Sequence, residues 1–91
     1  MRTMEKVWLV MRESNIDGET LFSALPFANE ESAVEFLKNT KESILSSRTY
    51  SGLDEDDFDM EDEKCHFWIS LNYDDFYEDV WIEEHQVFEK A

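Results

Sequence analysis

The clearest strand signal in the chain is the stretch Cys65-His66-Phe67-Trp68-Ile69-Ser70-Leu71-Asn72. Its apolar residues at odd positions alternate with His66, Trp68 and Ser70, and a period of two places the two sets on opposite faces of a sheet. A strand of this kind packs one face on a core and leaves the other open, which is typical of an antiparallel sheet. The stretch therefore predicts a sheet with one covered face.

The segment that follows, residues 80–88, is ambiguous between strand and helix. Its β-branched and aromatic side chains favour a strand. The alternative is a helix that begins near Asp75, with Glu78 in a capping-box position. We predict the strand, which a two-residue turn at Asp74 and Asp75 would place beside residues 65–72.

Two further strands are predicted near the N-terminus. Residues 6–11 are apolar on both alternating sets, and residues 20–25 follow them after an Asp-Gly turn signal. Pro26 ends the second strand, because proline cannot donate a hydrogen bond to a ladder. Residues 6–25 therefore predict an antiparallel hairpin.

A helix is predicted over residues 30–47. Asn29 precedes it as an N-cap, and the two glutamates that follow suit the positive end of the helix dipole. Apolar residues recur at helical spacing, and Gly52 offers a stop. Together the elements predict an α+β fold in the order β-β-α-β-β, with two layers: a four-stranded antiparallel sheet and one helix packed on one face.

Acid is concentrated in the second half of the chain. Residues 1–53 carry six bases and eight acids, whereas residues 54–91 carry two bases and fifteen acids, so most of the net charge of −15 lies after residue 53. The densest run is residues 54–63. Like charges at this density disfavour compact structure, so a flexible acidic loop is predicted at about 53–63.

The length of 91 residues allows a single domain, 1–91. The one cysteine, Cys65, permits no intramolecular disulfide, which suits a reducing compartment. No stretch reads as a secretory signal or approaches the ~18 apolar residues of a membrane span. We therefore expect a cytoplasmic protein that does not bind membranes.

The tryptophans mark a candidate binding surface. If the last two strands pair through a turn at Asp74 and Asp75, Trp68 lies opposite Trp81 on the sheet face away from the helix. Tryptophans on an uncovered face form the kind of apolar patch that binds partners, although they could instead be covered or serve as a cross-strand pair that supports the sheet. The same face could also join two copies of the chain as a homodimer. The predicted partner-binding residues are Trp68, Trp81, Asp74, Asp75, Glu78, Asp79, Glu83 and Glu84.

No catalytic, cofactor-binding or metal-binding residues are predicted. Cys65, His66 and His85 lack the spacing of a zinc site, and adjacent strand residues point to opposite faces. The acidic run lacks the glycine and the closing glutamate of a calcium-binding loop, whether the loop begins at Asp54 or at Asp57. There is no phosphate-cradling glycine loop and no serine elbow, so we do not expect an enzyme.

The sequence predicts a small acidic interaction domain that binds a protein partner through its carboxylate-rich C-terminal half. Such a charge repels nucleic acid and attracts a basic partner, so direct nucleic-acid binding is not expected. The alternative is a nucleic-acid mimic, which presents carboxylates in place of phosphates and inhibits a basic nucleic-acid-binding protein. A third reading is a structural domain in which the acid only keeps the chain soluble.

Overall fold

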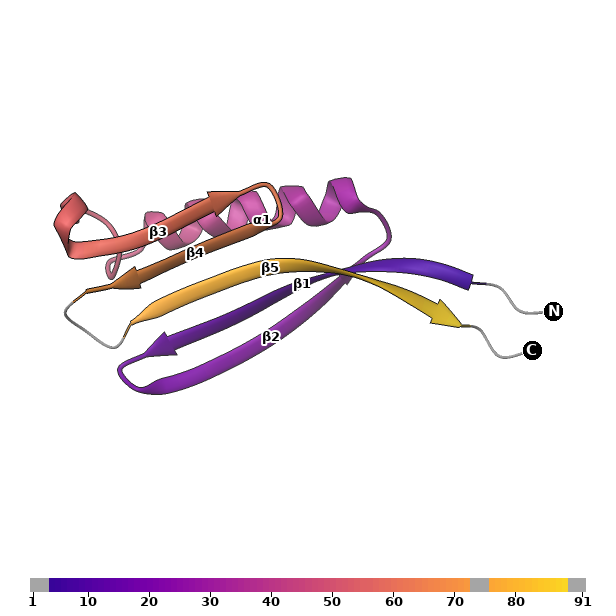
Figure 1. Ribbon diagram of the computed structural model, residues 1–91, viewed down its shortest axis with the longest axis horizontal. Helices are drawn as coiled ribbons and strands as arrows, with labels where there is room; N and C mark the ends of the chain where they lie inside the picture. The colour runs from indigo at the N-terminus through magenta and orange to yellow at the C-terminus, as the bar shows by residue number, and fades with distance from the viewer. Residues whose placement is uncertain (1–3, 73–75, 89–91) are drawn as a thin grey trace.

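The computed structural model describes residues 4–72 and 76–88 and has an α+β architecture with one helix and one antiparallel sheet (Figure 1). The sheet has five strands, so the expected four-stranded sheet is wrong by one strand. The elements in chain order are β1 (Met4–Ile16), β2 (Glu19–Phe27), α1 (Glu30–Leu45), a 3-10 turn η1 (Glu55–Asp57), β3 (Phe58–Glu63), β4 (His66–Leu71) and β5 (Tyr77–Phe88).

The strands lie in the order β2-β1-β5-β4-β3, and every neighbouring pair is antiparallel. The last strand, β5, therefore lies at the centre, between the first hairpin and the β3–β4 hairpin. Helix α1 packs over one face of this sheet, as Figure 1 shows. We call that side the helix face, and the opposite side the open face.

The first hairpin is confirmed, with Asp17 and Gly18 forming its two-residue turn. Both residues have positive φ, 54° and 85°, as in the type I′ turns whose twist matches that of paired strands. Strand β2 continues through Pro26 to Phe27, so the expected end of the strand at Pro26 is wrong. A proline is tolerated there because β2 is an edge strand, and its nitrogen faces no neighbour.

The predicted helix is also confirmed, and it begins where the cap was expected. The Asn29 side chain accepts a hydrogen bond from the Ser32 backbone N–H at 2.8 Å. The helix ends at Leu45 and not at residue 47, because Ser46 forms its C-terminal cap. Gly52 lies in the turn beyond, with a φ of 73°.

The core lies between this helix and the middle of the sheet. Phe67 and Ile69 from β4 and Val80 from β5 are fully buried beneath it. The buried core residues are Val10, Ala33, Leu37, Ile44, Tyr50, Phe67, Ile69 and Val80. The odd positions of β4 thus face the helix, as the alternation predicted.

The acidic run does not form the flexible loop expected at about 53–63. Residues 55–57 form the 3-10 turn, and residues 58–63 pair with β4 as the edge strand β3. Pairing is tolerated because the run itself alternates: Phe58 packs against the core, whereas most of its carboxylates remain in solvent. In addition, Lys41 of α1 contacts Asp62 at 2.8 Å.

Strand β5 is confirmed, and the alternative of a helix over these residues is wrong. The expected register between β4 and β5 is wrong by two residues, because Trp81 pairs with His66 and Trp68 pairs with Asp79. Strand β4 ends at Leu71 and β5 begins at Tyr77, so more than two residues separate them, and the Leu71 N–H donates to the Phe76 carbonyl at 3.0 Å. A shift of two residues keeps every side chain on its predicted face.

Candidate partner-binding face

The open face combines aromatic side chains with carboxylates. Because side chains alternate along a strand, the registers place the odd positions of β1, β3 and β5 and the even positions of β2 and β4 on this face. Its larger apolar members are Val7, Leu9, Met11, Phe22, Trp68, Tyr77 and Trp81. Phe22 is 60% exposed, and the others are partly exposed.

Trp81 lies at the centre of this face, in the central strand. Its indole Nε1–H donates to Oε2 of Glu83 at 2.6 Å, and the Phe22 ring centroid lies 6.3 Å from its own. His85 Nε2 lies 2.8 Å from the other oxygen of Glu83. The Trp81 hydrogen bond, and then the one from His85, lower the pKa of the Glu83 carboxyl below its ordinary value of 4.5. Glu83 is therefore a fixed anion next to the indole.

Trp68 lies diagonally from Trp81, on the neighbouring strand β4. It is flanked in the sheet by two acids, Glu61 on β3 and Asp79 on β5. Asp79 in turn lies 2.7 Å from Nε2 of His66. Each tryptophan on the open face thus has a carboxylate as an immediate neighbour.

Apart from the histidines when protonated, the charged side chains on the open face of the described strands are all acidic. No Lys or Arg occupies an open-face position in the strand residues that the structure describes, since the cations of these strands, Lys6 and Arg12, lie on the helix face. The carboxylates with described side chains on this face are Glu13, Asp59, Glu61, Glu63, Asp79 and Glu83. The face therefore attracts cations.

Among the predicted binding residues, Trp68, Trp81, Asp79 and Glu83 share the open face. Glu84 lies on the helix face, where Oε1 is 3.3 Å from Nζ of Lys6. Asp74 and Asp75 lie outside the described residues. Several members of the face were missed by the sequence reasoning, notably Met11 and Phe22, because nothing local indicates that the first hairpin extends the same sheet on the far side of β5.

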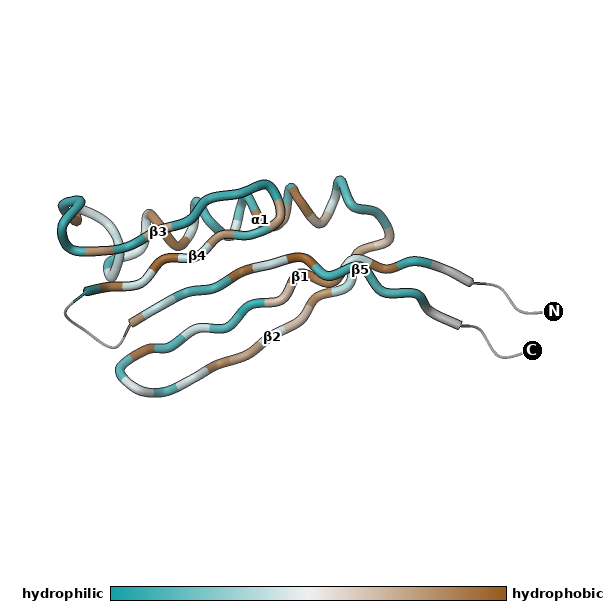
Figure 2. Tube along the Cα trace, viewed as in Figure 1, coloured by the Kyte–Doolittle hydropathy of each residue, from teal (hydrophilic) through white to brown (hydrophobic). Residues whose placement is uncertain are grey.

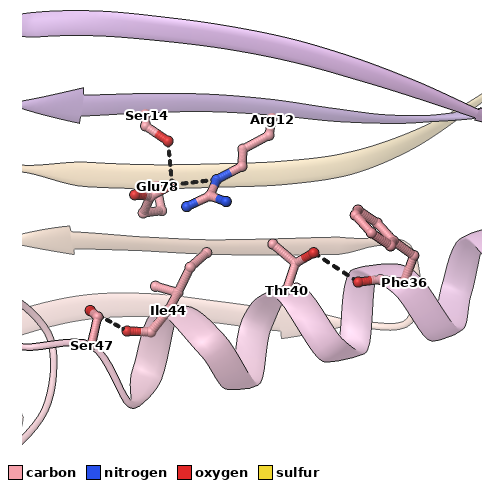
Figure 3. A network of polar contacts seen from close by, with 7 residues as sticks. All are labelled: Arg12, Ser14, Phe36, Thr40, Ile44, Ser47 and Glu78. Carbon is pink, nitrogen blue, oxygen red and sulfur yellow. Dashed lines mark hydrogen bonds and ion pairs between the residues drawn. The ribbon is translucent and has the colours of Figure 1, made fainter.

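Glu78 is not available to a partner, which corrects its place among the predicted binding residues. It is buried on the helix face, where Oε1 lies 2.9 Å from Nε of Arg12 and accepts a hydrogen bond from the Ser14 hydroxyl (Figure 3). A cavity of about 190 Å³ adjoins this network, between α1 and the sheet. Tyr50 also lines the cavity, and burial, together with the charge of Glu78, raises the pKa of its phenol to about 12. We interpret the network as a support for the fold, because Arg12 offsets the buried carboxylate.

The described part of the chain contains neither a group of metal ligands nor a helix that could cross a membrane. Within residues 4–72 and 76–88, no three His, Cys, Asp or Glu side chains are grouped so as to hold a metal ion. Cys65 is a free thiol, whereas His66 and His85 each contact a carboxylate. The single described helix is too short and too polar to cross a membrane.

No protein-family model, curated protein or solved structure matches this chain. The geometry and charge of the open face therefore carry the functional argument.

Proposed function

We propose that this protein is a non-enzymatic interaction domain that binds a basic segment of a protein partner on its open face. One observation carries the proposal: partly exposed aromatic rings lie among carboxylates, with no Lys or Arg at the described strand positions of that face. Carboxylates steer a cationic partner and speed its encounter, while aromatic burial slows its release.

The centre of the face suits an arginine or lysine side chain. A cation stacked on the indole of Trp81 would be attracted by the ring and would lie close to Glu83. That carboxylate is already held by the Trp81 and His85 hydrogen bonds, so little side-chain entropy is lost when it pairs with a cation. The site is therefore preorganised for a cationic side chain.

A titration with an arginine-rich peptide tests the proposal, with tryptophan fluorescence and NMR shifts as readouts. We expect shifts at Trp68 and Trp81, and binding that weakens as salt is added. Glu61→Gln should weaken binding, whereas Glu35→Gln, the same charge change on the exposed side of α1, should have a smaller effect. Equal effects of the two substitutions, or binding that ignores salt, would contradict a site on the open face.

Trp68→Ala separates binding from folding. Because Trp68 is only partly buried on the face away from the core, we expect weaker peptide binding with a nearly unchanged thermal midpoint. Phe36→Ala, which truncates an exposed ring on α1, is the control that should leave binding intact. A large fall in the midpoint of Trp68→Ala would instead make Trp68 part of the core.

A second candidate, the nucleic-acid mimic, is favoured by the order of β3. Asp59, Glu61 and Glu63 follow one another on the open face of a paired strand, about 6.8 Å apart along it, so they form a fixed row of anions. A mimic would compete with duplex DNA for a basic DNA-binding protein. Binding to an arginine-rich peptide without competition against DNA would favour the more general role.

A further inference from the structure

The two edges of the sheet differ sharply in charge. Edge strands usually carry charged side chains, which discourage pairing with another chain. Strand β3 follows this rule with four acids in its six residues, whereas residues 20–28, which include most of β2, have no charged residue at all. Figure 2 shows the same contrast, with β3 mostly teal and β2 mostly white to brown. The β2 edge therefore lacks the charged side chains that protect β3.

The register of the hairpin identifies the backbone groups that β2 leaves free. In a two-residue hairpin the residues next to the turn, here Ile16 and Glu19, form a hydrogen-bonded pair, and such pairs alternate along the ladder. Residues at even positions of β2 consequently direct their N–H and C=O groups away from β1. These outward residues are Thr20, Phe22, Ala24 and Pro26. Pro26, which has no N–H, occupies one of them, so its missing donor costs the β1–β2 ladder nothing.

The side chains of β2 are also exposed to solvent. Every residue from Glu19 to Pro26 is exposed, including Leu21 at 54% on the helix face and Phe22 at 60% on the open face. A long, apolar edge of this kind is a template for another strand.

We propose that β2 pairs antiparallel with β2 of a second copy of this chain, forming a two-fold symmetric dimer with a continuous ten-stranded sheet. In antiparallel pairing, outward residues of one strand hydrogen-bond outward residues of the other. Two registers use all three outward N–H groups: one sets Phe22 opposite Phe22 of the second copy, and the other sets Thr20 opposite Pro26. We assign the first, because Pro26 has no N–H to donate to the Thr20 carbonyl. Thr20 of each copy then lies opposite Ala24 of the other.

A second copy suits this edge because its acids lie away from the seam, although each copy carries a net charge of −15. In this register Glu19 lies opposite Leu25 of the second copy, so no acid faces an acid across the seam. The acid-rich β3 strands lie at the two outer edges of the joined sheet, as far apart as the topology allows. The two-fold axis of an antiparallel pair is perpendicular to the sheet, so both open faces share one side of the dimer, with the two Phe22 rings adjacent.

Sedimentation of the full chain over a range of concentrations and salt tests the dimer. We expect a monomer–dimer equilibrium that strengthens with salt, because both copies are strongly acidic. The peptide binding proposed above weakens with salt, so the two proposals fail independently. A monomer at all concentrations and salts would overturn the dimer and leave the open-face proposal intact.

Matched substitutions locate the seam. Ala24→Glu should weaken the dimer roughly tenfold, since it places a charge on the seam twice. Met60→Glu adds the same charge to the opposite edge and should leave the dimer intact. If Ala24→Glu disturbs the fold, Ala24→Pro is the substitute test. It removes one outward N–H, spares the β1–β2 ladder and should also weaken the dimer. Equal weakening by the two glutamates would overturn the assignment to β2.

Spin labels test the register. In a Cys65→Ser background, labels are attached to Thr20→Cys, Phe22→Cys and Ala24→Cys, one variant at a time. The proposed register predicts the strongest coupling between copies at position 22, and weaker, equal couplings at positions 20 and 24. Unequal couplings at the two flanking positions would overturn the register, and no coupling at position 22 would overturn the β2 seam.

Discussion

The carboxylate of Glu78 is buried in this acidic protein, and Arg12 is its cationic partner. They come from neighbouring strands, β1 and β5, and are separated by 66 positions in sequence. The side chain of Glu78 is only 7% exposed, whereas that of Arg12 is 39% exposed, so the anion has the larger desolvation penalty. Arg12 therefore stabilises the fold mainly by offsetting a buried negative charge.

Arg12→Met should destabilise the protein by about 2–4 kcal/mol, because it leaves the Glu78 carboxylate buried without its cation. The double variant Arg12→Met/Glu78→Leu should recover most of this loss, since it removes both charges and retains similar volume. Urea denaturation of both variants and of Glu78→Leu completes the cycle. If the double variant were as unstable as the sum of the two single variants, the residues would not be coupled.

Tyr50 is expected to lower the stability of the fold at alkaline pH. Its phenol has a pKa raised from 10.0 to about 12, chiefly by burial, so the folded state favours the neutral form. The corresponding stability is fully present below pH 10.0 and is lost as the pH rises from there through about 12.

Between pH 9 and pH 11 the wild type should therefore lose about 1–2 kcal/mol of unfolding free energy more than Tyr50→Phe. Denaturant titrations of both proteins at each pH measure the difference. Contributions from groups common to both proteins cancel in the comparison. Parallel losses in the two proteins would mean that Tyr50 does not cause the loss.

At the scale of elements, the helix and the two edge strands follow different rules. Helix α1 begins at a capping residue and buries a narrow apolar face, so local sequence suffices to define it. Strand β3 contradicts its own local signal, because four of its six residues are acids. It persists as a strand since β4 supplies the ladder and α1 supplies Lys41 for Asp62.

Lys41→Ala should loosen β3 without unfolding the rest of the sheet. The exposed ion pair contributes about 0.2–1 kcal/mol, and its loss leaves only acids along this edge. Hydrogen exchange should accelerate at β3 amides and stay unchanged in β1. Lys38→Ala, which removes an exposed cation from the same helix, is the control. Uniform acceleration in all strands would show instead that Lys41 supports the whole fold.

At the scale of the whole molecule, a net charge of −15 on 91 residues opposes compaction. The described cations reduce the repulsion locally, as in the contacts from Lys6, Lys41 and Lys64 to nearby acids. The remaining acids repel one another across the open face and along β3. Screening by salt should therefore stabilise the monomer itself.

Raising the sodium chloride concentration should increase the unfolding free energy by about 1 kcal/mol, or roughly 4–8 °C in thermal midpoint for a chain of this size. Ala24→Glu is the protein to measure, because its weakened seam separates this effect from dimerisation. Adding Glu61→Gln and Glu63→Gln should reduce the gain. A midpoint that falls with salt would show that attractive ion pairs outweigh the repulsion.

The sequence by itself determined what depends on neighbours along the chain. The Asn29 cap, the Asp17-Gly18 turn and the alternation in residues 65–72 are local signals, and each element lies where they predicted. The alternation also put Trp68 and Trp81 on one face, because a register error of two residues preserves the faces.

Only the tertiary structure decided which strands are neighbours. From the sequence, Glu78 was predicted to be a surface acid, but the pairing of β1 with β5 places Arg12 beside it. The same pairing brings Phe22 of the first hairpin next to Trp81. The acidic run became a strand because β4 offered it a free edge. Each of these outcomes depends on pairing between segments that are distant in sequence. Because any sequence can form the backbone hydrogen bonds between strands, local patterning cannot determine which strand pairs with which.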